Sequence, residues 1–193
     1  LDGIRIPALR YAYVDGTAPH TLDVTLPGAG ELYLDLGAFY IPEALEPARP
    51  ALARLSDACA ARYARAYELL AAAELASPHR VPGFFEESLP YTIDRRAASM
   101  ANRILPEGNL PGEQLRFLSA VTCQGYVTLW ETLESLCGRI CTLDNDLGFA
   151  PFFLTRMRRE ARARGLAVVT CPDPLCPVIP EALLLPDAGL AFA

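Results

Sequence analysis

The chain has 193 residues, of which 52% are hydrophobic and 21% are charged, so it can bury a core and does not have the composition of a disordered protein. Its formal net charge of −6 argues against nonspecific nucleic-acid binding, which needs a positive surface. All 17 basic residues are arginine, so the chain offers no lysine for a phosphate-binding loop or a Schiff base.

Targeting signals and metal-binding patterns are also missing from the sequence. No apolar stretch approaches the roughly 20 residues that cross a bilayer, and no signal peptide opens the sequence. The six cysteines do not have the spacing of a zinc knuckle. We therefore expect a cytoplasmic protein with reduced thiols, no metal site and no membrane contact. Because the sequence does not begin with Met, we also expect it to be a piece of a longer chain.

The first 76 residues predict one strand and one long helical region. Residues 9–16, LRYAYVDG, are typical of a short buried strand that ends at Asp15. A loop rich in Pro and Gly follows. From about residue 42 to 76 the sequence predicts helix, with a break near Pro50. Beyond the break, apolar residues recur at helical spacing.

The rest of the sequence alternates helices and strands. The expected elements are, in chain order, a helix at 91–105, a strand at 114–122, a helix at 124–139, a strand at 139–143, a helix at 151–164, a strand at 166–171 and a last apolar strand. This alternation predicts an α/β fold with a mostly parallel sheet flanked by helices and an α-helical insert. Ligands of such sheets bind at the carboxyl ends of the strands.

The two ends of the sequence align with each other without gaps. Residues 1–14 are LDGIRIPALRYAYV and residues 180–193 are PEALLLPDAGLAFA. Each has an acidic residue, an apolar segment, a proline, a short turn and an apolar strand. The match is either a coincidence or the trace of a duplication, in which case the sequence spans about one period of a repeated protein.

Several segments together resemble a known family. They are LDGIRIPALRYAYVDGTAPH, LPGAG and LDLGAFY near the N-terminus, and Ser119, Ala120, Thr122, Gly125 and Tyr126 in a segment of the type SAxTxxGY. On these segments the chain resembles the bacterial tandem P-loop ATPase-like proteins, which are found mostly in Firmicutes. The resemblance covers most of the chain, and DGTAPH is its most specific piece.

The resemblance implies a P-loop NTPase-like fold in three parts. Residues 1–40 would end a first P-loop-like half, residues 41–113 would be the helical insert, and residues 114–193 would be a second, degenerate half. The family also implies ATP and Mg²⁺ as cofactors, bound through a phosphate loop that would precede Leu1. For this chain alone we expect no cofactor.

By the same resemblance, the loop at 145–152 takes the place of the second Walker A motif. Asn145 stands at its first Gly, Gly148 in its interior, Ala150 at its second Gly, Pro151 at its Lys and Phe152 at its Ser or Thr. Pro151 supplies neither an N–H nor a cation, and Phe152 has no hydroxyl for Mg²⁺. Asp144 and Asp146 add negative charge where a polyphosphate would lie. We expect this loop not to bind ATP.

The DGTAPH segment carries the candidate catalytic residues. Asp15 is a candidate Mg²⁺ ligand of the Walker B kind, or else a turn aspartate before Gly16. His20 is a candidate general base or γ-phosphate sensor, or else a histidine that packs against a proline-rich loop. Thr17 lies on the same loop and is a candidate cofactor-binding residue.

Two main functional hypotheses follow, beside a third and weaker one, a small-molecule transferase that uses the DGTAPH loop without a phosphate-loop lysine. The first is a P-loop ATPase-like, nucleotide-binding protein that reaches ATP through an upstream half and is inactive as this isolated chain. The alternative is a non-enzymatic regulatory or protein-interaction module that binds a protein partner at its helical insert.

Overall fold

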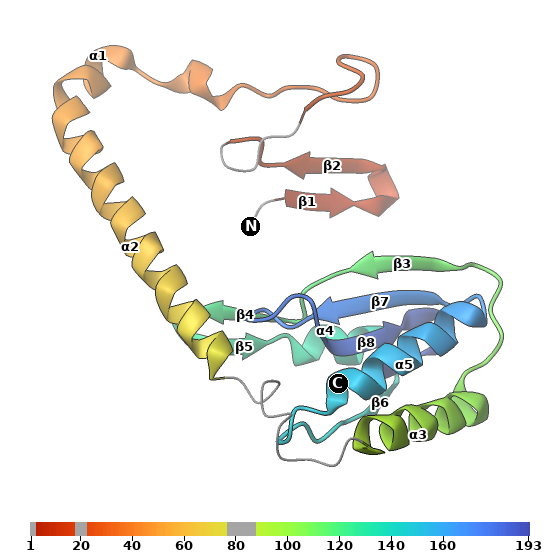
Figure 1. The fold of residues 1–193 in the computed structure, drawn as a ribbon. Helices are drawn as coiled ribbons and strands as arrows, with labels where there is room; N and C mark the ends of the chain where they lie inside the picture. The colour runs from red at the N-terminus through yellow and green to blue at the C-terminus, as the bar shows by residue number, and fades with distance from the viewer. Residues whose placement is uncertain (1–2, 18–22, 77–87) are drawn as a thin grey trace. The chain divides into compact units, whose positions relative to one another are not determined.

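The computed structural model describes residues 3–17, 23–76 and 88–193, which form two compact units, Leu1–Asp57 and Ala58–Ala193 (Figure 1). The boundary between the units falls within a long helix. Every buried residue among those described belongs to the second unit. The described part of the first unit therefore has no core of its own.

The N-terminal unit begins with a hairpin and ends in a long helix. Its elements are β1 (Gly3–Ile6), the 3₁₀ turn η1 (Pro7–Leu9), β2 (Tyr11–Val14), η2 (Leu36–Phe39), α1 (Pro42–Leu45), η3 (Glu46–Ala48) and the first part of α2 (Arg49–Leu75). The predicted break near Pro50 is confirmed as the interruption between α1 and α2. Pro50 lies in the first turn of α2, where the missing N–H costs no helical hydrogen bond.

The second unit contains the sheet and the helices that cover it. Its elements after α2 are α3 (Ser88–Ile104), β3 (Gly112–Leu115), β4 (Ser119–Thr122), β5 (Gly125–Thr128), α4 (Trp130–Leu136), β6 (Arg139–Cys141), α5 (Ala150–Ala163), β7 (Ala167–Pro172), β8 (Pro180–Leu185), η6 (Pro186–Ala188) and β9 (Leu190–Phe192).

Five strands form the central sheet in the order β3–β7–β8–β9–β6. β3 is parallel to β7 and β6 is parallel to β9, whereas the β7–β8 and β8–β9 pairs are antiparallel. The prediction of a mostly parallel, P-loop NTPase-like sheet is therefore wrong. The sheet is mixed, and β1–β2 and β4–β5 form two separate antiparallel pairs.

Two tight turns explain the error. The sequence predicts one apolar strand at the C-terminus, but the turn Pro186–Ala188 and Gly189 fold this segment into the β8–β9 hairpin. The predicted strand at 114–122 divides into β3 and β4, and the predicted helix at 124–139 starts as β5 and becomes helical only at Trp130. Short turns impose antiparallel pairing, whereas parallel neighbours need a longer crossover.

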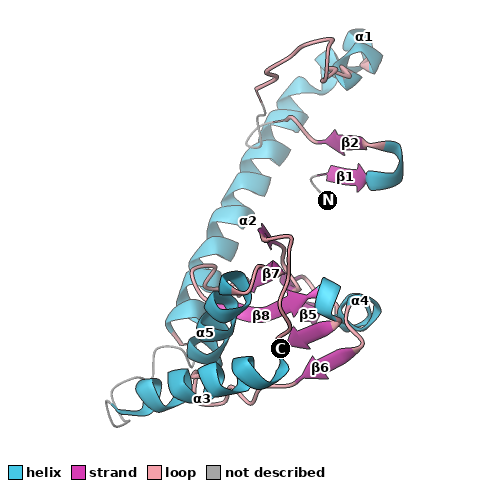
Figure 2. Cartoon of the chain, turned by 90° about the vertical axis from the view of Figure 1, so that its right-hand side faces the viewer, coloured by secondary structure: helices cyan, strands magenta, loops and turns pink. Residues whose placement is uncertain are grey.

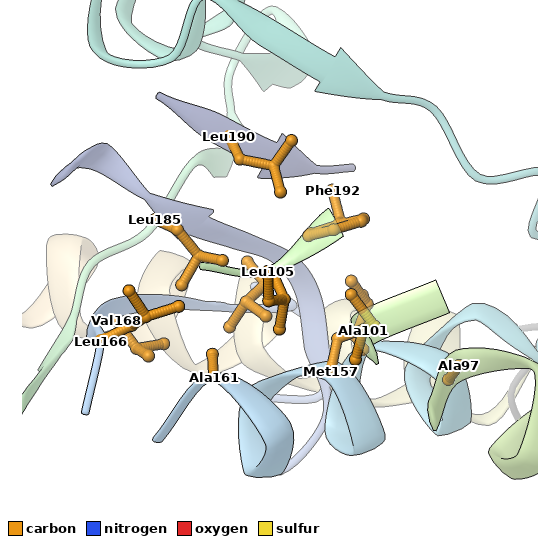
Figure 3. Close-up of a cluster of buried hydrophobic side chains, with 12 residues drawn as sticks. Ala97, Ala101, Leu105, Met157, Ala161, Leu166, Val168, Leu185, Leu190 and Phe192 are labelled. Atoms are coloured by element: carbon orange, nitrogen blue, oxygen red, sulfur yellow. The ribbon is translucent and has the colours of Figure 1, made fainter. Parts of the chain in front are cut away.

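The core lies on both faces of this sheet. Along β8 and β9, alternate side chains point to opposite faces. On one face, Leu183, Leu185, Leu190 and Phe192 pack with the apolar sides of α3 and α5, as Figure 3 shows for the labelled residues. The helices α3 and α5 lie against each other on that face (Figure 2). The other face carries a smaller cluster, made of Leu118, Leu133, Cys137, Cys171, Ala182, Leu184 and Ala191.

Candidate functional site

The loop predicted as a degenerate Walker A motif joins β6 to α5 and is closed by its own hydrogen bonds. The Gly148 N–H donates to the carbonyl oxygen of Asn145 at 2.9 Å, with Gly148 at a φ of 73°. The Asn145 side-chain oxygen accepts a hydrogen bond from the N–H of Ala150, the first residue of α5, at 2.9 Å. Asn145 therefore acts as a side-chain cap for the helix.

The first backbone positions of α5 offer little to a phosphate. The Ala150 N–H is bound to Asn145, Pro151 has no N–H, and the Phe152 N–H donates to the Phe149 carbonyl oxygen at 3.1 Å. Phosphate sites at helix N-termini depend on such N–H groups pointing at the ligand. We therefore expect no phosphate binding at this loop. The occupied or missing N–H groups are a reason for this expectation that does not depend on the missing lysine and hydroxyl.

Three of the predicted loop residues line a cleft of about 360 Å³: Gly148, Pro151 and Phe152. The charged groups beside them bind each other. Arg156 donates to Asp94 at 2.8 Å and to Glu160 at 2.8 Å. The cleft therefore presents mainly apolar surface next to two arginines, Arg156 and Arg159, that share the carboxylate of Asp94.

Asp15 and Thr17 lie together after β2 in a local turn. One carboxylate oxygen of Asp15 accepts hydrogen bonds from the Thr17 backbone N–H at 2.9 Å and from the Thr17 hydroxyl at 2.7 Å. This contact is the Asx-turn arrangement of a turn aspartate, the structural alternative considered for Asp15. His20 lies outside the described residues, so its role as a general base or γ-phosphate sensor stays a prediction.

A cleft of about 610 Å³, here called the arginine cleft, lies between β3 and α5. It is lined by Pro111, Gly112, Glu113, Thr155, Arg158, Arg159, Arg162 and Ala163. Glu113 is the only carboxylate among these described residues, and it forms ion pairs with Arg158 at 2.6 Å and with Arg162 at 3.1 Å. The lining therefore keeps an excess of positive charge on an otherwise acidic chain, which favours small anions over cations.

Glu113 also ties the edge strand β3 to its neighbour, because it accepts a hydrogen bond from the Thr170 hydroxyl at 2.9 Å. Burial alone would raise the pKa of Glu113. The hydrogen bonds from Arg158 and Thr170 and the charges of Arg158 and Arg162 outweigh it, so this pKa lies below its ordinary value.

A second group of polar side chains, here called the bulge cluster, surrounds Glu181. Cys171 pairs with Ala182 while Pro172 pairs with Pro180, so Glu181 is the extra residue of a β-bulge. Bulges re-aim side chains, and they occur often beside functional sites. The Tyr126 hydroxyl donates to Glu181 at 2.7 Å, which links the β4–β5 hairpin to the sheet.

The ionisation of the bulge cluster is shifted by its surroundings. Burial, aided by the nearby charge of Asp173, raises the pKa of Glu181 despite the hydrogen bonds from Tyr126 and Ser119. Burial also raises the pKa of the Tyr126 hydroxyl. The Cys171 thiol has a pKa raised to about 12, mainly by burial, so it is not a reactive thiolate at neutral pH.

The raised pKa predicts how Glu181 affects stability. The folded state holds this proton more tightly than the unfolded state, so the stabilisation is greatest below the unfolded pKa and is lost as pH rises through the folded one. We expect Glu181→Gln to raise the melting temperature at pH 7, because glutamine can still accept the Tyr126 hydrogen bond without a buried charge. The gain should shrink as pH falls through the raised folded pKa and should be gone below about 4.3, the unfolded value for Glu.

Glu113→Gln is the matched control, with the opposite sign. The lowered pKa of Glu113 stabilises the fold above the unfolded pKa and ceases to do so as pH falls through the folded one. This variant should therefore melt below the unmodified chain at pH 7 and approach it in acid. Two variants that shift the melting temperature in the same direction at pH 7 would contradict the opposite environments assigned to these carboxyl groups.

The aligned chain ends fold into hairpins with the same register. In the N-terminal hairpin (β1, η1 and β2) the paired residues are Ile4↔Tyr13, Arg5↔Ala12 and Ile6↔Tyr11. In the C-terminal hairpin (β8, η6 and β9) they are Leu183↔Phe192, Leu184↔Ala191 and Leu185↔Leu190. Each pair in the N-terminal hairpin therefore aligns in sequence with a pair in the C-terminal hairpin.

The turns of the two hairpins are also alike. Each is a 3₁₀ turn that starts with proline and ends in a left-handed residue, Arg10 at φ 56° and Gly189 at φ 60°. The backbone N–H of each left-handed residue donates to the carbonyl oxygen of the turn's proline, Pro7 or Pro186. Equal register and equal turn geometry favour a duplication over a chance match.

The comparisons with known proteins found no match for the chain. No family model, no curated protein and no solved structure matches it. The resemblance to tandem P-loop ATPase-like proteins therefore stays a prediction. Within residues 3–17, 23–76 and 88–193, no three His, Cys, Asp or Glu side chains are grouped to hold a metal ion. No helix in those ranges has the length and apolar character of a membrane span.

Two features of the second unit were not predicted. Nothing near Glu113 in the sequence pointed to its place opposite the arginines of α5. Glu181 stood out only as the counterpart of Asp2 in the alignment. Glu113 is placed by the pairing of β3 with the distant strand β7, and Glu181 meets Tyr126 from 55 residues away, so the local pattern of residues does not encode either contact.

Proposed function

We propose that the chain is a non-enzymatic protein-interaction module whose N-terminal unit is covered by another polypeptide. The main support is the contrast between the two hairpins. Tyr11 and Tyr13 are 63% and 62% exposed, whereas Leu190 and Phe192 at the same positions of the C-terminal hairpin are 2% and 0% exposed. Apolar side chains gathered on a surface are typical of interaction sites.

The chemistry of the N-terminal hairpin favours a polypeptide over other ligands. Among the described residues, β1 and β2 pair only with each other, so each has an outer edge that can hydrogen-bond to a further strand. Polypeptides form such bonds along a strand edge, whereas lipids and nucleic acids do not. The net charge of −6 also disfavours nucleic acid and anionic membranes.

The helical insert carries exposed apolar side chains of its own on α2. No residue of α2 is buried, although Leu52, Leu55, Tyr63, Tyr67, Leu69 and Leu75 are all large and apolar. The ATPase-like hypothesis has less support, because the cap at Asn145 and the residues Pro151 and Phe152 leave the loop without the groups that hold ATP and Mg²⁺.

The test is site-specific photo-crosslinking in the cells that make the protein. We expect p-benzoylphenylalanine in place of Tyr13 to give one discrete adduct, with a single segment of one polypeptide identified by mass spectrometry. The matched control is the same substitution at Tyr91, which is also a tyrosine and is 65% exposed, on α3. Adducts at Tyr13 that are as scattered among abundant proteins as those at Tyr91 would contradict the proposed function.

A further inference from the structure

We infer that the N-terminal hairpin is the closing hairpin of a second sheet of the same design as the central sheet. The partner that covers it is then a strand–helix–strand unit of the kind formed here by β6, α5 and β7. This inference rests on the proposed function and specifies its partner. It is carried by the shared register and turn of the two hairpins and by the surroundings of the C-terminal one.

The central sheet shows which neighbours such a hairpin takes. β7 runs antiparallel along the outer edge of β8, and β6 runs parallel along the outer edge of β9. By equivalence, the partner supplies an antiparallel strand along β1 and a parallel strand along β2. Two strands flanking a hairpin in this way need a crossover connection, which in the central sheet contains α5.

The side chains of the N-terminal hairpin suit a helix on one face. Ile4, Ile6, Tyr11 and Tyr13 stand where Leu183, Leu185, Leu190 and Phe192 pack against α3 and α5. All four are large and at least partly apolar, so the face has the same character in the two hairpins. The partner's helix therefore needs an apolar side, as α5 has in Leu154, Met157 and Ala161.

The opposite face indicates that the partner is not a second copy of this chain. There, Arg5 takes the position of Leu184, which is 3% exposed in the central sheet. A guanidinium buried among the apolar residues of that face would need a counter-charge. The buried residues around Leu184 are apolar, and Ile140, Val169 and Ala193 pack against them, so a guanidinium does not suit that position in the central sheet of another copy. We infer a distinct strand–helix–strand unit with an acidic side chain, or open solvent, facing Arg5.

A fused chain tests this inference directly. Residues 88–179 are joined to the N-terminus of the complete chain, so that Ile179 precedes Leu1 and the N-terminal hairpin follows a strand–helix–strand unit as the C-terminal hairpin does. This prefix serves as the binding partner. The fused chain is made in two versions, one with Arg5 and one with Arg5→Leu. Hydrogen exchange of residues 4–6 and 11–13 is compared with that of 183–185 and 190–192, which serve as an internal reference for folding.

We expect the N-terminal hairpin amides to exchange freely in the unmodified chain. In the fused Arg5→Leu chain they should exchange at least about a hundredfold more slowly, because strands inside a sheet open only by sub-global unfolding. With Arg5 retained, the protection should be weaker. A third version with Tyr13→Asp places a charge at the position of Phe192 and should lose the protection while the reference hairpin keeps its own.

Three results would overturn the inference. The first is free exchange of the N-terminal hairpin in both fused chains while the reference hairpin is protected. The second is strong protection already in the unmodified chain, because the hairpin would then need no partner. The third is a discrete Tyr13 adduct on a segment that is not a strand of a strand–helix–strand unit. This last result would leave the proposed function intact and refute only the partner named here.

Discussion

Replacing Phe192 by Ala is expected to lower the free energy of unfolding by about 3–5 kcal/mol. The same truncation at the equivalent position of the N-terminal hairpin, Tyr13→Ala, should change it by less than about 0.5 kcal/mol. Phe192 is 0% exposed and its ring lies 5.9 Å from the ring of Phe153, between centroids. Tyr13 has the same place in its hairpin but is 62% exposed.

The difference between these two variants separates the fold from the proposed interaction. Urea denaturation followed by the fluorescence of Trp130, the single tryptophan, reports on the second unit, and far-UV circular dichroism reports on both. Comparable losses for the two variants would mean that Tyr13 already packs in a core of the isolated chain. In the fused chain with Arg5→Leu, by contrast, Tyr13→Ala should become costly, because its ring would then be buried.

The elements that the sequence predicted well are those with a strong local pattern. The helix expected at 151–164 is α5, and the helix expected at 91–105 is α3, each shifted by a few residues. The strands expected at 139–143 and 166–171 are β6 and β7. In each case the apolar periodicity and the flanking Gly or Pro residues act within the segment itself.

The sheet was mispredicted because strand direction depends on the turns. The segment PDAG at 186–189 has a proline to start a turn and a glycine at the left-handed position, which is a hairpin signal. The alignment of the chain ends already indicates a short turn here, but only the apolar segment after it is predicted as a strand, so the hairpin is missed. The same turn in the N-terminal hairpin has Arg10 at the left-handed position, so the glycine alone would not have revealed that the two ends share a fold.

Some features of the candidate sites can likewise be predicted from the sequence, whereas others depend on the fold. The loss of phosphate-binding chemistry at Pro151 and Phe152 is visible in the sequence, because it follows from what these side chains lack. The cap from Asn145 to the Ala150 N–H is not visible, because it requires the positive φ of Gly148 to bring the side chain across the loop. The bulge cluster is even harder to predict from the sequence, because it forms only where the register between β7 and β8 shifts.

Gly165→Ala is expected to lower the free energy of unfolding by about 2–5 kcal/mol. A left-handed conformation costs a non-glycine residue roughly 1–2 kcal/mol, and overpacking adds about 1–3 kcal/mol. Gly165 follows α5 at φ 72°, and a Cβ there would lie 2.8 Å from the carbonyl oxygen of Gly108. The Gly108 N–H donates to the Arg164 carbonyl oxygen at 2.8 Å, so the two backbones cannot separate without losing this bond.

Gly189→Ala is the control for this prediction, since it has a φ of 60° but open space around its Cβ position. It should cost only the conformational part, roughly 1–2 kcal/mol, because Arg10 shows that a non-glycine residue can occupy the equivalent turn position. Equal losses in thermal denaturation would show that the contact with Gly108 contributes nothing. A larger loss for Gly165→Ala would show that the end of α5 fixes the segment leading into β3, and with it the position of Glu113 in the arginine cleft.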